Sequence, residues 1–379
     1  MKSLINVKIY TGKKIIENGY LCYEEKIEEI GCMSEFKSRK DEKMKDGQNS
    51  IVIPGMIDIH IHGGYDVDAM DANPITLLKM GHELMKEGVT TFFPTTITQS
   101  IDSIQKALYA IREAKELGGH FDYIHLEGPF VNTKRAGAQP LQYILKPNVK
   151  LFKKWQEISG NLIKLVTYAP ELKDATELEE EFEKMGVVGT VGHSNAKIND
   201  FVGKKITHAT HLFNQMRAMH HLEPGTVGHA LLSDEVMVEI IADGIHVHPD
   251  MIKLAYKLKG PRKISVITDA MRAKGLDEGE YELGGQPVFV KGKSARLADG
   301  TLAGSILKMD EAFRNIMLYT GCSVEEAVSM TSVNQAEEFG LFQKGVLDIG
   351  KDADFVEMTL DFHVIETTRL GKTYEEVTV

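Results

Sequence analysis

The sequence predicts an α/β protein built around a (β/α)8, TIM-like barrel. From Pro54 onward, short apolar runs alternate with stretches of helical periodicity, and this order gives parallel strands joined by helices. Eight such runs are present, and eight units of this kind close a barrel of about 250 residues. The candidate strands are residues 57–60, 90–94, 124–127, 163–169, 187–193, 206–211, 236–243 and 264–269.

Both ends of the chain read as short strands with turns. Residues 1–52 begin with Ile5, Val7 and Ile9 alternating with polar residues, which is the pattern of a half-buried strand. Residues 345–356 (GVLDIGKDADFV) return to turn-and-strand character after the last helical stretch.

Two helices between the strands have clear signals. The apolar residues of 101–111 fall on one helical face, and Gly118-Gly119 offers a stop. Ser323 and Glu326 have the spacing of a capping box. An open doubly wound sheet is the alternative to the barrel. A G-x-G-x-x-G loop after the first strand would favour that sheet, but the strand ends in HIHGG.

The composition is that of a globular protein, with 42% hydrophobic and 26% charged residues among 379. Lysine and arginine total 44 against 55 acidic residues, and the net charge of −11 argues against general binding to nucleic acid or to an anionic membrane. The chain has three cysteines, no signal-peptide core and no apolar run of membrane-spanning length. We therefore expect a soluble, cytoplasmic protein with reduced thiols.

Metal-ligating side chains gather at the carboxyl ends of the predicted strands, where a barrel of this type builds its active site. The first strand gives IDIHIHGG, in which His60 and His62 are two residues apart and point the same way from one face. Two neutral imidazoles suit a divalent metal. Ordinary core packing also explains a lone HxH pair, so its meaning depends on the other strands.

Four more strands end in a side chain of the same kind. Glu127 closes the third strand, His193 the fifth and Asp269 the eighth. The sixth offers two histidines in opposite pleat phases, and we take His211 as the ligand and His208 as a core histidine. All donors are nitrogen or oxygen, which fits Zn²⁺, Fe²⁺, Mn²⁺, Co²⁺ or Ni²⁺ without distinguishing among them.

At this point the chain resembles the amidohydrolase superfamily and, within it, the N-acetylglucosamine-6-phosphate deacetylase family. The motifs that carry the resemblance are PGMIDIHIHGG, HLEGPF, RAGAQP, GHSNA, THLFNQM, EPGTVG, IADGIHVHP, VITDAM, LAGS and GKDADF. The resemblance implies a catalytic barrel at residues 54–343 and a small flanking β-sandwich domain formed from both termini, residues 1–53 and 344–379. It also implies a homodimer that removes the N-acetyl group of an amino-sugar phosphate, releasing acetate.

The resemblance assigns roles to the candidate ligands. It implies one or two divalent ions per subunit, with Glu127, His193 and His211 at a main site. The HxH pair holds a second ion in some members, bridged by Glu127, and Asp269 lies beside that ion as the catalytic acid and base. The implied metal positions are His60, His62, Glu127, His193, His211 and Asp269.

Family positions that contact substrate are also matched here. His246 lies in DGIHVHP. The alternative to a substrate contact at this position is a loop histidine that makes a hydrogen bond to the backbone. Many members carry His at the position of Gln139, whose amide can still donate a hydrogen bond. The matched positions are Ala138, Gln139, Asn214, Gln215, His246, Leu302, Ala303 and Gly304.

One family position is lost. An arginine that reaches the substrate phosphate across the dimer interface is replaced by Leu222, which cannot form charge-assisted hydrogen bonds. Either the substrate lacks the phosphate, or another cation takes over. The nearby candidates are Arg217, His220, His221, Arg272 and Lys274.

Three alternatives to this function remain open. The same deacetylation can act on N-acetylgalactosamine-6-phosphate or on a non-phosphorylated N-acetyl amino sugar. Another amidohydrolase, such as a cyclic-amide hydrolase or a D-aminoacylase, is a second alternative. Cyclic-amide hydrolases use a carboxylated lysine as the metal bridge, and Lys164 lies on the fourth strand, but Glu127 already supplies a bridging carboxylate. A non-catalytic scaffold is the third, although such proteins usually lose their metal ligands.

Overall fold

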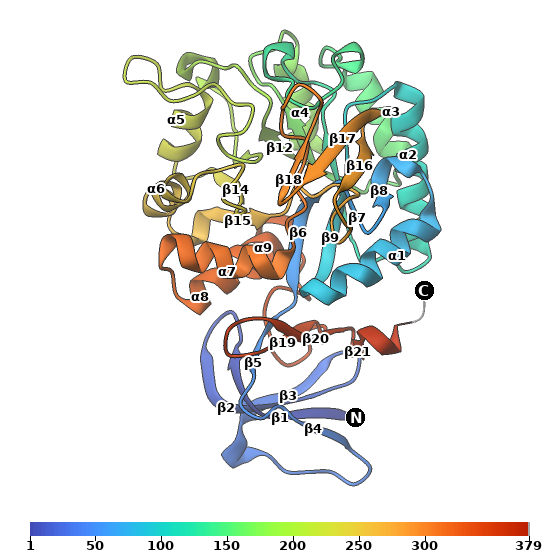
Figure 1. Ribbon diagram of the computed structural model, residues 1–379, viewed down its shortest axis with the longest axis vertical. Coiled ribbons are helices and arrows are strands. Elements are labelled where there is room, and N and C mark those ends of the chain that lie inside the picture. The colour runs from blue at the N-terminus through green and yellow to red at the C-terminus, as the bar shows by residue number, and fades with distance from the viewer. Residues whose placement is uncertain (378–379) are drawn as a thin grey trace.

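The computed structural model describes residues 1–377, and the predicted barrel is its larger part (Figure 1). Each barrel strand is parallel to its neighbours in chain order. Backbone bonds close the ring, because the amide of His62 donates to Ala270 and that of Asp269 to His60. The strands are β6 (Met56–Ile61), β9 (Val89–Thr96), β10 (Ile124–Glu127), β11 (Ile163–Tyr168), β12 (Val188–Val191), β13 (His208–Ala209), β14 (Met237–Ile241) and β15 (Ile264–Ile267).

All eight predicted barrel strands are present, but five end earlier than the sequence pattern indicates, and in three of these five a site residue follows the shortened strand. The sixth, predicted over residues 206–211, is only the two-residue β13. The backbone turns into the left-handed region at His211 (φ 31°), and the same happens at His193 (φ 46°) and Asp269 (φ 49°). Regular strand geometry is interrupted at such a residue. These three site residues therefore lie in kinks immediately after their strands.

Nine α-helices of at least five residues lie within residues 1–377, mostly packed around the barrel (Figure 1). In α2, Ile104, Leu108 and Ile111 are buried as the periodicity predicts, whereas Ile101, in the first turn, is exposed. The capping box at Ser323 is confirmed. The nine α-helices are α1 (Pro74–Leu84), α2 (Ile101–Glu116), α3 (Val149–Ile158), α4 (Ala175–Met185), α5 (Gly225–Leu232), α6 (Pro249–Lys259), α7 (Met309–Thr320), α8 (Val324–Val328) and α9 (Asn334–Phe339).

Across residues 1–377, no helix combines the length and the apolar character needed to cross a membrane.

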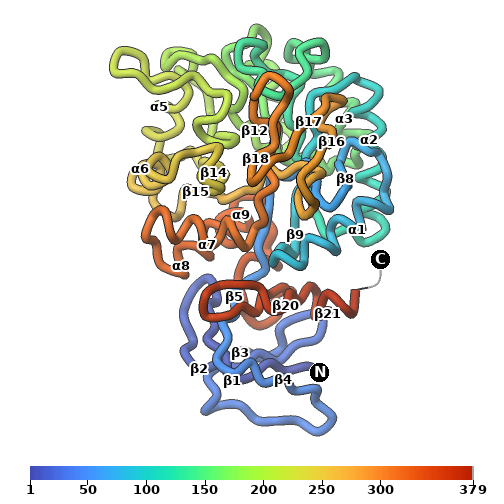
Figure 2. Tube along the Cα trace, viewed as in Figure 1, coloured from blue at the N-terminus to red at the C-terminus, as the bar shows by residue number. Residues whose placement is uncertain are grey.

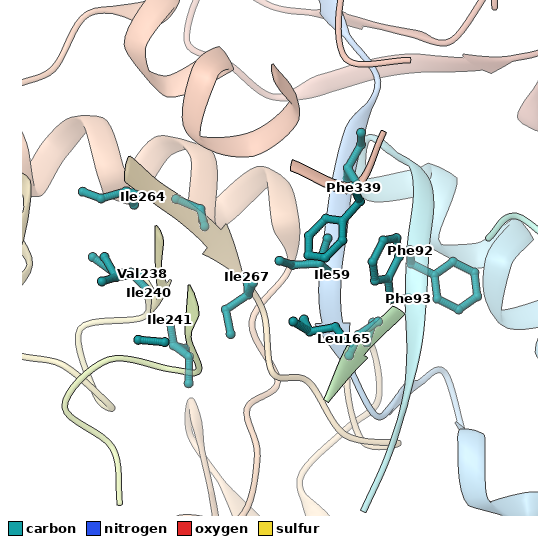
Figure 3. Close-up of a cluster of buried hydrophobic side chains, with 14 of the residues drawn as sticks. Ile59, Phe92, Phe93, Leu165, Val238, Ile240, Ile241, Ile264, Ile267 and Phe339 are labelled. Carbon is teal, nitrogen blue, oxygen red and sulfur yellow. The ribbon is translucent and has the colours of Figure 1, made fainter. Parts of the chain in front are cut away.

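Large apolar side chains pack the barrel strands against the helices around them. Figure 3 shows Ile59, Phe93 and Leu165 directed toward one another, with Phe339 of α9 packed on Phe93. All but Phe339 are completely buried, and burying a side chain of this size stabilises the fold by about 1.5–3 kcal/mol. This core supports the strand ends from which the site is built.

The strands from the two chain ends form a second body below the barrel (Figures 1 and 2). Hydrogen bonds join them into one branched sheet, in which the N-terminal and C-terminal strands meet at a β5–β19 pair. The sheet has its own core, which includes Leu4, Leu21 and Phe355. The domain boundaries at 53/54 and 343/344 stay a prediction. The strands are β1 (Lys2–Tyr10), β2 (Ile15–Tyr23), β3 (Ile27–Cys32), β4 (Lys43–Asp46), β5 (Ile51–Pro54), β19 (Phe355–Met358), β20 (Val364–Arg369) and β21 (Lys372–Thr373).

Two small sheets are inserted into the barrel. One is the pair β7 (Gly63–Gly64) and β8 (Val67–Asp68), which follows β6. The other is an antiparallel three-stranded sheet between β15 and α7, shown in orange in Figure 1. We call it the inserted sheet; its strands are β16 (Gly279–Leu283), β17 (Gln286–Lys291) and β18 (Ser294–Arg296). It packs on a hydrophobic cluster separate from the barrel core.

A buried ion pair joins the segment after β15 to the end of the first barrel unit. Lys274 Nζ lies 2.9 Å from Glu87 Oε2, and both side chains are almost completely buried. Glu87 also accepts hydrogen bonds from the Tyr65 hydroxyl and the Met309 amide. Breaking such a pair leaves a buried charge without compensation.

We expect Lys274→Met to lower the free energy of unfolding by about 3–5 kcal/mol, because the Glu87 carboxylate loses its cation. The double variant Lys274→Met, Glu87→Gln should recover part of this loss, because no net charge stays buried and the amide oxygen still accepts. Urea unfolding of the two variants and the wild type measures the difference. A double variant no more stable than the single one would contradict this account.

Candidate active site

Glu127, the last residue of β10, is the centre of the cluster. Its Oε1 lies 3.1 Å from His193 Nε2 and 3.0 Å from His211 Nε2, and its Oε2 lies 3.3 Å from His62 Nε2. All four side chains are buried. Residues from β10 and from the ends of three other barrel strands thus meet at one carboxylate.

Asp269 and His60 complete the same cluster from the barrel closure. Asp269 Oδ1 lies 3.3 Å from His62 Nε2 and 3.5 Å from His60 Nε2. His60 Nε2 is also 3.7 Å from Glu127 Oε1. The structure therefore brings all six sequence-predicted metal positions to one place.

The donor atoms of this cluster fit a divalent metal ion. His60 Nε2 is buried and has no hydrogen-bond partner, which is costly for a polar atom unless something binds it. His193 Nε2 and His211 Nε2 face each other at 3.2 Å. In each of two groups the donor atoms lie within 4.8 Å of one another: His60, His62 and Glu127, and Glu127, His193 and His211.

The shifted pKa values in the cluster also indicate that positive charge beside Glu127 is favourable. Burial alone would raise the pKa of Glu127, but hydrogen bonds from His193, His211 and His62 hold it well below its usual range. Burial would likewise lower the pKa of His211, but the hydrogen bond and charge of Glu127 raise it to about 9. A bound cation supplies the same charge and releases the protons.

The imidazole rings are held so that Nε2 faces the centre. In each of three histidines, Nδ1 lies within hydrogen-bond distance of an oxygen outside the cluster, which orients the ring for a metal. The pairs are His193 with the Arg135 carbonyl at 2.8 Å, His62 with the Thr95 carbonyl at 3.2 Å, and His60 with Glu239 Oε2 at 2.9 Å.

His208 lies outside the cluster, as the sequence analysis expects. It is completely buried, with Nε2 3.2 Å from Glu239 Oε1 and Nδ1 2.8 Å from Glu338 Oε1. Burial would lower the pKa of His208, but the two carboxylates raise it to about 10. This histidine therefore makes a buried ionic contact and is turned away from Glu127.

Gln139 orients Glu127. Its Oε1 accepts from the Thr98 amide at 2.9 Å, and since a backbone N–H only donates, the Gln139 NH₂ must face the other way. That NH₂ donates to Glu127 Oε2 at 2.7 Å. An imidazole at this position would offer only one donor or acceptor per nitrogen.

A cavity of about 310 Å³ opens over the cluster. His246 faces this cavity, and its Nδ1 is held by Asp243 Oδ2 at 2.6 Å. Ala303 does not line it: this residue packs in the hydrophobic cluster under the inserted sheet. The predicted substrate positions that do line it are Ala138, Gln139, Asn214, Gln215, His246, Leu302 and Gly304.

The cations suggested to replace the missing arginine are elsewhere in the structure. Lys274 is paired with Glu87 and Arg272 with Asp71, and Arg217 donates to the Asn195 carbonyl. None of these three, nor His220 or His221, lines the cavity.

Sequence reasoning missed the cation that does line it. Among the residues lining this cavity, Arg296 of β18 is the one lysine or arginine. It lies in the inserted sheet, outside the strand–helix repeat. No local sequence pattern indicates this placement, which is made in the folded chain, where Arg296 forms a β-bridge with Leu302 of the LAGS motif.

A (β/α)8 barrel with a histidine–carboxylate cluster at its strand ends is typical of a class of metal-dependent hydrolases. This chain belongs to the Amidohydrolase family, whose model matches residues 51–374. Within it, the chain is similar to N-acetylglucosamine-6-phosphate deacetylase from Bacillus subtilis (strain 168). The two are 45% identical over 377 residues, covering 97% of this chain and 95% of the relative. The chain is also 34% identical over 352 residues to the deacetylase of the same name from Homo sapiens, and the match covers 88% of this chain and 86% of the relative.

Solved structures agree with these relatives. The chain is similar to a variant of N-acetyl-D-glucosamine-6-phosphate deacetylase from Mycobacterium smegmatis in complex with N-acetyl-D-glucosamine-6-phosphate. The TM-score is 0.93 at 28% identity, covering 98% of this chain and 99% of that one. It is also similar to the N-acetylglucosamine-6-phosphate deacetylase from Thermotoga maritima, with a TM-score of 0.87 at 30% identity and coverage of 99% and 100%.

We expect Zn²⁺ to stabilise the metal-free protein, because the folded cluster binds the ion and the unfolded chain has no assembled site. At 100 times Kd the gain in the free energy of unfolding is about 2.7 kcal/mol. Glu127→Gln should lose most of this gain, while the exposed Glu183→Gln should keep it. Urea unfolding with and without zinc measures the effect. A wild-type protein that zinc does not stabilise would contradict the metal site.

Proposed function

We propose that this chain is a metal-dependent deacetylase that hydrolyses N-acetylglucosamine-6-phosphate to glucosamine-6-phosphate and acetate. The observation that carries the proposal is the cluster around Glu127 at the base of a cavity that seven of the eight predicted substrate positions line. A deacetylase of this name is 45% identical to the chain, and a solved relative is in complex with this substrate.

The metal would be held by side chains of the cluster. Glu127, His193 and His211 are the proposed ligands of a main site, and His60 and His62 with Glu127 those of a second. A divalent ion in such a site lowers the pKa of bound water and polarises a substrate carbonyl. The donor set is compatible with zinc, iron, manganese, cobalt or nickel, and with one ion or two.

Asp269 is the proposed catalytic acid and base. Its carboxylate lies in the cluster and lines the cavity, so it contacts both the ligands and the space for substrate. The hydrogen bond with His62 and the charges of His60 and His62 keep its pKa below the usual range, against the effect of burial. The ionised carboxylate accepts a proton from the attacking water and returns it to the departing sugar amine.

The sugar would be held by the loops that surround the cavity. His246 is oriented by Asp243, so its Nε2 is directed to the substrate side, and Asn214 and Gln215 follow the kink at His211. Gln139 is already bonded to Glu127 and Thr98, so its proposed role is to hold the carboxylate.

Asp269→Asn tests this mechanism. We expect kcat to fall by about 10²–10⁴-fold, because the amide cannot take up the proton. The fold should be kept, since asparagine tolerates the left-handed backbone at this position. Acetate release and metal content of the purified variant are the measurements. A variant with near-normal kcat would remove Asp269 from the mechanism.

The phosphate contact must differ from that of the family pattern. Leu222 is 81% exposed and outside the cavity lining, so within one subunit it contributes nothing to the site. Arg296 is the cation that lines the cavity, and a guanidinium suits a phosphate because it can donate two parallel hydrogen bonds. We propose Arg296 as the phosphate contact of this chain.

Arg296→Gln should lower kcat/KM for N-acetylglucosamine-6-phosphate by about 10–100-fold, because a hydrogen bond to a charged group contributes about 1.5–3 kcal/mol. The value for N-acetylglucosamine should not change. Arg262→Gln, an exposed arginine paired with Glu337, is the matched control.

The same assay separates the alternative substrates. If wild type hydrolyses both sugars equally, the substrate of this chain lacks the phosphate. If wild type prefers the phosphorylated sugar and Arg296→Gln keeps that preference, the phosphate is bound by another group. Including N-acetylgalactosamine-6-phosphate tests the choice of sugar epimer.

A cytoplasmic homodimer is also part of the proposal. Cys22, Cys32 and Cys322 form no disulfide, which suits a reducing compartment. Large apolar side chains are exposed near the position of the missing arginine, among them Met219 and Leu222. In a dimer of the family type this loop would be covered by the second subunit.

A further inference from the structure

Glu239 of β14 is a carboxylate buried completely inside the barrel, beside the metal cluster but outside the cavity lining. A carboxylate at this depth is tolerated only if its oxygens are well hydrogen-bonded.

Three nitrogens surround the two oxygens of Glu239. Oε2 lies 2.9 Å from His60 Nδ1 and accepts from the His211 backbone N–H at 3.0 Å, and Oε1 lies 3.2 Å from His208 Nε2. A carboxylate only accepts hydrogen bonds, so each of the three partners must be the donor. The proton of a neutral His60 ring is therefore on Nδ1.

This assignment fixes what His60 presents to the cluster. With its proton on Nδ1, the ring directs the lone pair of Nε2 toward Glu127 and Asp269, 3.7 and 3.5 Å away. That nitrogen is the buried atom without a hydrogen-bond partner. The same oxygen of Glu239 holds the amide of His211, whose backbone is in the left-handed region.

A separate metal site at Glu239 is the competing interpretation, since His60, His125 and Glu239 have donor atoms within 4.8 Å of one another. The hydrogen bonds argue against it. His60 Nδ1 and both oxygens of Glu239 are already engaged, and His125 Nε2 lies 2.7 Å from the Thr167 hydroxyl. An ion at this place would have to break these bonds.

We propose that Glu239 is a positioning residue of the metal centre, which selects the metal-binding tautomer of His60 and holds the backbone of His211. The inference rests on the proposed metal site. It adds a residue of β14, a strand that supplies none of the predicted ligands.

Three variants test the proposal. Glu239→Met keeps the length of the side chain but accepts no hydrogen bond, and we expect the zinc affinity of the metal-free protein to fall about 10–100-fold. Glu239→Gln should rescue most of this loss, because its oxygen can accept from both His60 and His211 while its NH₂ faces His208. Glu338→Gln, which contacts only the other side of His208, is the matched control and should bind zinc like wild type.

Calorimetric zinc titration and thermal unfolding are the measurements for these variants. Glu239→Met with wild-type zinc affinity would overturn the proposal, and so would Glu338→Gln with the same loss as Glu239→Met. A lower unfolding midpoint with unchanged affinity would show a structural role only and would also overturn it. If wild type itself binds no zinc, the metal site and the proposed function fail, which is a different result.

The wild-type protein offers a test that does not depend on the folding of a variant. In ¹⁵N NMR of the zinc-loaded protein, His60 should carry its proton on Nδ1, with Nε2 shifted by the metal. The signals are assigned by comparison with His60→Gln. A proton on Nε2 of His60 would overturn the proposal.

Discussion

The attraction between Glu127 and the imidazoles around it is the interaction on which the site depends. One carboxylate at the end of β10 approaches His62, His193 and His211, each from a different strand end. A buried charge of this kind is unfavourable unless opposite charge surrounds it. The strand ends are therefore held together by the same electrostatics that make a place for a divalent cation.

The backbone contributes to this arrangement at some cost. His193, His211 and Asp269 all have positive φ values, and each non-glycine residue in that region costs about 1–3 kcal/mol when the surrounding structure enforces it. The closure of the barrel enforces it at Asp269, whose amide donates to the His60 carbonyl. Barrel closure and the placement of Asp269 are thus one structural feature.

The sequence predicts the parts of the site that follow from strand periodicity. His60, Glu127 and His193 end apolar runs, and the carboxyl ends of parallel strands meet at one face, so their convergence needs no tertiary information. The choice of His211 over His208 also came from position along the strand. The kink at His211 that shortens β13 cannot be predicted in this way, because it depends on hydrogen bonds between strands.

Other parts of the site depend on contacts between distant segments. Gln139 approaches Glu127 from a loop, and Glu239 meets His60 across 179 residues of chain. Arg296 lies on the inserted sheet, whose placement over the barrel follows from the packing of its hydrophobic cluster. No local pattern in the sequence indicates any of these three contacts.

The inserted sheet has a consequence for how enzymes of this architecture diversify. It enters the chain between β15 and α7, packs on its own apolar cluster and brings Leu283 and Arg296 to the wall of the cavity. The candidate metal ligands come from other segments. Substitutions or length changes in the insert can therefore alter which acyl amino sugar is accepted while the chemistry at the strand ends is inherited unchanged, so selectivity and reactivity are free to evolve separately.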